Sequence, residues 1–210
     1  MKKVIAFILA MLVVIPAAMA ANPAKQLQKA KDKERKVVLN NLKKGHWELM
    51  GSSRSLEVAL LQHWSELDAL GENGREVVGT STRSKSKNIG QQMATNNAII
   101  NYAQEAASTI EGQVVSDFAG SGVDVSAEFE NLFGAYRRNV EKELNGELKH
   151  SFSLVRVNPE GDYEVQSFFI INESAASRKR IQALKNALAE SEIAADHAQK
   201  INEFINRNSK

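Results

Sequence analysis

LKHSFSLVRVNPEGDYEVQSFFII, residues 148–171, is the stretch that decides the fold. On both sides of its centre, apolar and polar residues alternate with a period of two, which is typical of strands that bury one face of a sheet. Residues 158–161 (NPEG) lie between the two halves and combine the residue types that favour a tight turn. The segment therefore predicts a β-hairpin, with strands through Leu148–Leu154 and Tyr163–Ile171.

The rest of the chain shows both helical and strand patterns. Apolar residues that recur at spacings of three and four predict helices, and Val- and Thr-rich runs between turn residues predict strands. In chain order, these patterns predict a helix over 23–44, a short strand over 46–53, a helix over 55–70, a strand over 75–84, a helix over 89–118, a helix over 126–144, the hairpin, and a helix from Ser174.

The two longest predicted helices carry different apolar patterns. The helix over 89–118 has small residues, among them Ala94 and Ala98, that allow close packing. Its buried stripe is expected to contain Met93, Ile100, Ala103, Ala107, Ile110 and Val114. The helix from Ser174 is expected to continue towards residue 210 as one long helix with a heptad-like seam from Ile181 to Ile205. The seam has two possible arrangements, packing on its own domain or pairing with a second chain, and we expect the first, which favours a monomer.

Strands mixed with long helices predict an α+β fold: a small antiparallel sheet packed against long helices, with helical N- and C-terminal extensions. The sheet is expected to be covered on one face. The predicted organisation is a helical arm at 21–44, an α+β domain at 45–172 and a long C-terminal helix at 173–210.

The N-terminal 20 residues have the features of a cleavable export signal. Lys2 and Lys3 precede an apolar run from Val4 to Ile15, and Ala18-Met19-Ala20 forms a small-residue cleavage site. A retained anchor is the alternative, but the run is shorter than the roughly 20 residues that span a bilayer. Cleavage near Ala20/Ala21 predicts a periplasmic or secreted protein. The chain has no cysteine, which excludes disulfides and cysteine acylation.

The charge of the chain is uneven. Removing Lys2 and Lys3 from 27 Lys and Arg leaves 25 against 25 Asp and Glu, so the mature chain is formally neutral. Residues 21–44 hold eight basic and two acidic residues. This basic arm has three interpretations: a solvated helix, a dock for anionic lipid or lipopolysaccharide, or a partner-binding helix. Global neutrality argues against nucleic-acid binding.

The sequence offers no catalytic, cofactor-binding or metal-binding residue. No pair among the four histidines has metal-ligand spacing, and no nucleophile elbow, phosphate loop or dinucleotide glycine pattern occurs. A polar group inside the 89–118 helix has two interpretations, a solvated face or a hydrogen-bonding patch for a ligand or partner helix. The histidines are His46, His63, His150 and His197, and the polar group is Asn96, Asn97, Asn101 and Gln104.

Three segments also resemble a known family. They are the strand EVVGTS (76–81), the helix MATNNAIINYA (93–103) with Ile110–Ser116 beyond it, and the hairpin strands at 151–157 and 161–165. Over about 75–172 the chain resembles the LPP20-type lipoprotein domain, which is related to the N-terminal domain of flagellar assembly protein T. The resemblance implies a small α+β envelope module without catalytic residues. The chain departs from the lipoprotein members because it lacks the acylated cysteine.

These observations predict an exported, non-catalytic cell-envelope protein that binds another envelope component, with a protein as the expected partner. The alternative is an exported hydrolase or small-ligand-binding protein whose site is assembled by tertiary contacts. A deep pocket that joins His63, His150 or clustered carboxylates would favour the alternative.

Overall fold

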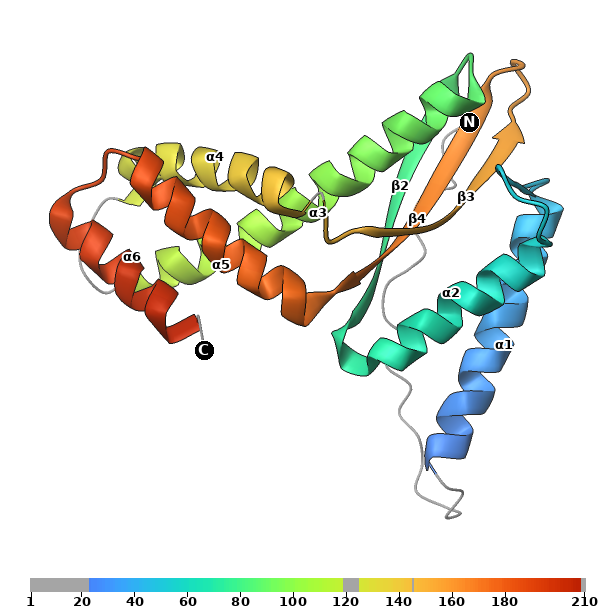
Figure 1. Ribbon diagram of the computed structural model, residues 1–210, viewed down its shortest axis with the longest axis horizontal. Coiled ribbons are helices and arrows are strands. Elements are labelled where there is room, and N and C mark those ends of the chain that lie inside the picture. The colour runs from blue at the N-terminus through green and yellow to red at the C-terminus, as the bar shows by residue number, and fades with distance from the viewer. Residues whose placement is uncertain (1–22, 119–124, 145, 209–210) are drawn as a thin grey trace. The chain divides into compact units, whose positions relative to one another are not determined.

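The computed structural model of the chain describes residues 23–118, 125–144 and 146–208. The predicted export signal at 1–20 and the predicted helix break at 119–122 lie outside the described residues. The chain divides into two compact units, one up to Asn40 and one from Asn41 onward, and each is described by itself. Helices at both ends and one four-stranded antiparallel sheet confirm the α+β fold (Figure 1).

The first unit is dominated by helix α1, Pro23–Lys44, which matches the predicted helical arm. Proline is favoured in the first turn because its missing N–H is not needed there. Lys43 and Lys44 lie in the last turn, where positive charge interacts favourably with the helix dipole. From Lys25 to Lys44, no side chain of α1 is buried.

The sheet confirms the predicted hairpin. Strands β3 (Lys149–Val157) and β4 (Tyr163–Asn172) pair antiparallel, and the full order is β1-β3-β4-β2. Strand β2 is Gly74–Ser84, as predicted. Strand β1 contains only Glu48–Leu49, shorter than the predicted 46–53. His46 (φ +55°) and Gly51 (φ +67°) explain this difference, because left-handed backbone at both positions ends the extended conformation.

Both faces of the sheet carry a helix, so the expectation of one covered face is wrong. Helix α3 (Lys87–Phe118) covers the face on which Phe169 and Ile171 are buried, and α2 (Leu56–Leu70) contacts the other face. There, His63 of α2 packs edge-on against Phe152 and against Phe168. The two aromatic rings of this face stack on each other across β3 and β4, with their centroids 4.4 Å apart. Because side chains alternate along β4, this strand contributes to hydrophobic packing on both faces of the sheet.

Helix α3 approaches β2 very closely at Gly79. A Cβ atom on Gly79 would lie 1.8 Å from the carbonyl oxygen of Ala94 and 2.6 Å from the backbone nitrogen of Ala98. Both alanines are fully buried, as their small size suggested. Met93 and Ile100, expected in the buried stripe, are instead 43% and 38% exposed. The close approach turns the alanine face towards the sheet, which rotates these two larger side chains outward.

The C-terminal half of α3 packs against α4 (Val125–Leu144) and two further helices, α5 (Glu173–Glu190) and α6 (Ala195–Asn208). The prediction of one long C-terminal helix is wrong, because residues 191–194 are not helical. Ser191 adopts extended backbone with ψ of 138°, and its hydroxyl donates to the carbonyl oxygen of Ala187. Such local hydrogen bonds compete with helix continuation. The break lets α6 fold back, which buries Ile201 and Ile205.

Replacing Gly79 with Ala is expected to lower the free energy of unfolding by more than about 3 kcal/mol, because the new methyl group meets backbone that cannot move aside. Gly112→Ala is the matched control within α3, since a Cβ atom there meets no atom within 4 Å. This control is expected to raise stability by about 0.5–1 kcal/mol through helix propensity. Chemical denaturation measures both, and equal effects of the two substitutions would contradict the close approach.

Candidate functional site

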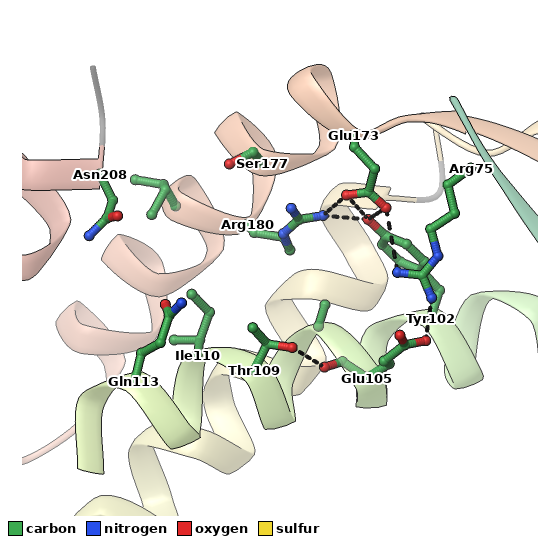
Figure 2. Close-up of a pocket in the computed structure, with 12 residues that line it drawn as sticks. Arg75, Tyr102, Glu105, Thr109, Ile110, Gln113, Glu173, Ser177, Arg180 and Asn208 are labelled. Carbon is green, nitrogen blue, oxygen red and sulfur yellow. Dashed lines mark hydrogen bonds and ion pairs between the residues drawn. The ribbon is translucent and has the colours of Figure 1, made fainter. Parts of the chain in front are cut away.

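A series of hollows lies between the C-terminal half of α3 and helices α5 and α6. The most enclosed of them has a volume of about 320 Å³ and is lined by residues of β2, α3, α5 and α6 (Figure 2). It adjoins more open hollows of about 660 Å³ and about 290 Å³ along α3 and α6. Neighbouring hollows share lining residues, so together they form one groove, here called the α3–α6 groove. The shared residues are Thr109, Gln113, Asn208, Asp117, Phe204 and Arg207.

A charged hydrogen-bond network closes one end of the groove, and we call it the Glu173 network. The Glu173 carboxylate accepts from the Tyr102 hydroxyl at 3.0 and 3.1 Å and from Arg180 Nη1 at 2.8 Å. Arg180 Nη1 also donates to the Tyr102 hydroxyl oxygen. Arg75 Nη1 lies 3.6 Å from Glu173 Oε1, and Arg75 pairs with Glu105 as well. Figure 2 shows Tyr102, Arg180 and Arg75 meeting at Glu173, and the separate contact of Arg75 with Glu105.

Elements distant in sequence bring this network together. Arg75 lies near the start of β2, where it pairs with Ile171 of β4. Glu173 follows β4 directly as the first residue of α5, and the Asn172 side chain caps that helix. Arg180 comes seven residues later, two turns along the same helix face. Helix α3 supplies the remaining two members, Tyr102 and Glu105.

Burial raises the pKa of the Tyr102 hydroxyl, and the Arg180 guanidinium opposes part of that effect. Tyr102 therefore remains protonated at neutral pH and donates to Glu173. The Arg75 and Arg180 guanidiniums also lie 5.1 and 5.9 Å from the centroid of the Tyr102 ring, within range of cation–π attraction. Two arginines thus face two carboxylates, and the network is formally neutral. Its members satisfy one another's hydrogen bonds.

The structure separates the four histidines. His63 is fully buried, with its Nε2 atom 2.5 Å from Glu76 Oε2, and His197 lies among aromatic rings, 5.5 Å from Phe118 between ring centroids. His46 is exposed on the surface. Neither His63 nor His150 lines the α3–α6 groove. Within the described parts of the chain, no cluster of three His, Asp or Glu side chains is arranged to hold a metal ion.

His150 belongs to a chain of polar side chains under α3. Its Nε2 atom lies 2.8 Å from Ser153 Oγ, which lies 2.9 Å from Ser167 Oγ and accepts from Gln91 Nε2 at 3.1 Å. A serine beside a histidine is the pairing of a nucleophile with its base. However, Ser153 is only 1% exposed and Ser167 is fully buried. The chain therefore satisfies polar groups between sheet and helix, as buried hydroxyls require.

The polar group on α3 divides into one anchor and three exposed side chains. Asn97 Nδ2 donates to the Thr80 carbonyl oxygen of β2 at 2.8 Å, which fastens α3 to the edge strand of the sheet. Asn96, Asn101 and Gln104 are exposed. The solvated-face interpretation therefore describes three of the four residues, and Asn97 bonds within the protein rather than to a ligand.

Sequence reasoning missed the members of the Glu173 network. Arg75, Tyr102 and Glu173 are separated by 27 and 71 positions, and no motif links them. The available signal was the spacing of Glu173 and Arg180, which places opposite charges on one helix face. That signal is common on solvated helices and did not distinguish this pair.

Comparison of the chain with protein-family models, with curated proteins and with solved structures gives no significant match. Among the helices that the structure describes, none is both long enough and apolar enough to cross a membrane.

Glu173→Ala is expected to lower the free energy of unfolding by about 2–3 kcal/mol, because it leaves Tyr102, Arg180 and Arg75 without their common acceptor. Tyr102→Phe is expected to lower the free energy of unfolding by only about 1 kcal/mol, since the contact between Glu173 and Arg180 remains. Glu192→Ala, at an exposed position between α5 and α6, is the control and is expected to change stability by less than about 0.5 kcal/mol. Thermal or chemical denaturation ranks the three. A Glu173 variant as stable as the control would mean that the network is not structural.

Partial burial lowers the pKa of the His150 imidazole, because its charged form loses part of its solvation. The unfolded chain then takes up this proton at higher pH than the folded chain, so the stability linked to His150 is lost as pH falls below about 6.5. The difference in unfolding free energy between the wild type and His150→Gln is expected to shrink from pH 8 to pH 5.5. Denaturation across this range measures it, and a difference that stays constant with pH would exclude the linkage.

Proposed function

We propose that the protein is an exported, non-catalytic component of the cell envelope that binds another envelope protein through the α3–α6 groove. In this proposal the LPP20-like resemblance over 75–172 describes a non-lipidated member of an envelope module family. The partner contacts the groove between α3 and the two C-terminal helices, and the protein acts in the periplasm or outside the cell.

The observation that carries the proposal is the self-neutralised Glu173 network. Catalytic carboxylates and tyrosines need protons that can be exchanged with a substrate. Here the Glu173 carboxylate already accepts hydrogen bonds from Tyr102 and Arg180, and the raised pKa of Tyr102 makes its hydroxyl a weak proton donor. Ser153, beside His150, is buried, and neither residue lines the groove. These features support a binding surface rather than a reaction centre.

The shape of the groove supports a macromolecular partner. Its more open part runs along α3 past Ser108, Gly112 and Ser116, where small side chains leave the helix surface accessible. Ion pairing between Arg207 and Asp117 spans it at 2.7 Å. Open, elongated hollows with mixed polar and apolar walls suit a peptide segment or a helix of a partner protein.

The burial of the C-terminal seam supports a monomer. Ile181 and Leu184 of α5 and Ile201 and Ile205 of α6 are all buried within their own chain. These are the apolar side chains that a second copy would need for a coiled-coil pairing.

Small-ligand binding is the second candidate. The enclosed end of the groove, at about 320 Å³, falls within the volume range of small-molecule sites, and Arg75 and Arg180 line it. In this alternative a small molecule would exchange hydrogen bonds with the Glu173 network, and Tyr102→Phe would weaken its binding. Retention of a small molecule by the purified protein, found by native mass spectrometry, would favour this candidate.

Gly112→Arg is expected to reduce capture of the partner at least tenfold, because the new side chain occupies the open part of the groove. The position tolerates a side chain, since nothing lies within 4 Å of a Cβ atom there. The measurement is cross-linking and pull-down from the native cell envelope with the chain from Ala21 onward. The matched control is Asn96→Arg, which adds the same charge at an exposed position of the same helix. Equal capture by both variants would exclude the groove as the binding surface.

A further inference from the structure

Helix α1 carries a line of lysines on one face. Lys25, Lys29, Lys33 and Lys36 follow one another at spacings of four, four and three, and all four side chains are exposed. At 100° per residue they fall within an arc of about 80° and extend over about 17 Å of helix. We call these four residues the lysine stripe.

No acidic and no apolar side chain of the helix lies inside the arc of the stripe. Asp32 borders the arc, and Glu34 lies on the opposite side, so no acidic residue lies inside it. The exposed apolar residues Leu27 (59% exposed), Val37 (51%) and Val38 (38%) also lie outside the arc. A surface that contacts the stripe is therefore in contact mainly with positively charged side chains.

This composition does not resemble the centre of a protein–protein interface. Such centres are enriched in aromatic residues, methionine and arginine, and lysine is depleted there. From Pro23 to Lys44 the helix has no aromatic residue and no methionine, and only one arginine. Lysines are flexible, strongly hydrated point charges that interact with a delocalised anionic surface without demanding a fixed geometry.

Deep insertion into a membrane also does not fit. A helix that inserts in the interface needs a continuous apolar face, often with Trp or Phe. The apolar residues of α1 form only a partial stripe, with no aromatic anchor. Attraction between lysines and anionic headgroups needs neither a continuous apolar face nor an aromatic anchor. Each lysine near such a surface strengthens binding about fivefold.

We propose that α1 docks along the headgroup surface of an anionic lipid bilayer, with Lys25, Lys29, Lys33 and Lys36 facing the lipid phosphates. The inference rests on the proposed function in one respect, because export brings the chain to an envelope membrane. The docking is peripheral and electrostatic, and it uses residues other than those that line the α3–α6 groove.

The test is co-sedimentation of the chain from Ala21 onward with two kinds of vesicle: phosphatidylcholine alone, and phosphatidylcholine with about one third phosphatidylglycerol. One variant replaces the four lysines of the stripe with glutamine, which preserves helix propensity. The matched control replaces Arg138, Lys142, Arg178 and Lys185 with glutamine; these residues are exposed and lie on other helices, and the net charge falls by the same amount. Circular dichroism checks that both variants keep their helix content.

The wild type and the control are expected to bind the anionic vesicles and not the neutral ones, and the stripe variant to bind at least about 100-fold more weakly. Raising the salt from about 0.1 M to about 1 M is expected to release the wild type, because the screening length shortens from about 10 Å to about 3 Å.

Several outcomes would overturn the proposal: no binding of the wild type to anionic vesicles, equal losses in both quadruple variants, or binding that survives high salt. Loss of a captured acidic protein in the stripe variant, without vesicle binding by the wild type, would instead assign α1 to a protein partner. Failure of the proposed function would differ, because the groove variant Gly112→Arg and its Asn96→Arg control report on partner capture and not on vesicle binding.

Discussion

Helix α3 and strand β2 meet at Gly79 with no side chain between their backbones, and much of the fold depends on this contact. Because Ala94 and Ala98 fill the space above the glycine, the first half of α3 is held against the sheet. The helix is 32 residues long, so its second half extends past the sheet and forms the core with α4, α5 and α6. One helix therefore belongs to both parts of the domain, and its position on the sheet sets where the helical part begins.

The Glu173 network lies where these two parts meet. Arg75 comes from the sheet, Tyr102 from the middle of α3, and Glu173 from the junction of β4 and α5. A buried tyrosine and two arginines on one carboxylate form a charge-assisted cluster, and such bonds are stronger than neutral ones. The partly exposed side chains of Glu173 and Arg180 reduce its electrostatic contribution through solvent screening. The network still connects the start of α5 to α3 and β2 through Tyr102 and Arg75.

The two proposed binding surfaces differ in the interaction that each offers a partner. The α3–α6 groove offers a concave surface of defined shape, with small side chains on its floor and charged groups that already pair with one another. The lysine stripe offers charge and little shape, because flexible side chains on a solvated helix have no fixed geometry. In the two proposals, one surface binds a protein partner and the other binds a lipid headgroup layer. Lipid binding by the stripe would give a chain without an acylated cysteine a route to a membrane.

The sequence by itself determined the elements whose cause is local. The period of two around residues 158–161 predicted the hairpin, and spacings of three and four predicted α1, α2, α3 and α4, because these patterns state which face of an element is apolar. They do not state what covers that face.

Only the tertiary structure decided that Phe168 and Phe169 pack on opposite faces of the sheet, that Met93 is exposed, and that the C-terminal helix breaks at Ser191. The break depends on burial of Ile201 and Ile205, a gain that exists only once α3 is in place. The Glu173 network could not be predicted for the same reason: Arg75, Tyr102 and Glu173 come together through the crossing of α3 over the sheet, and no local pattern encodes that geometry.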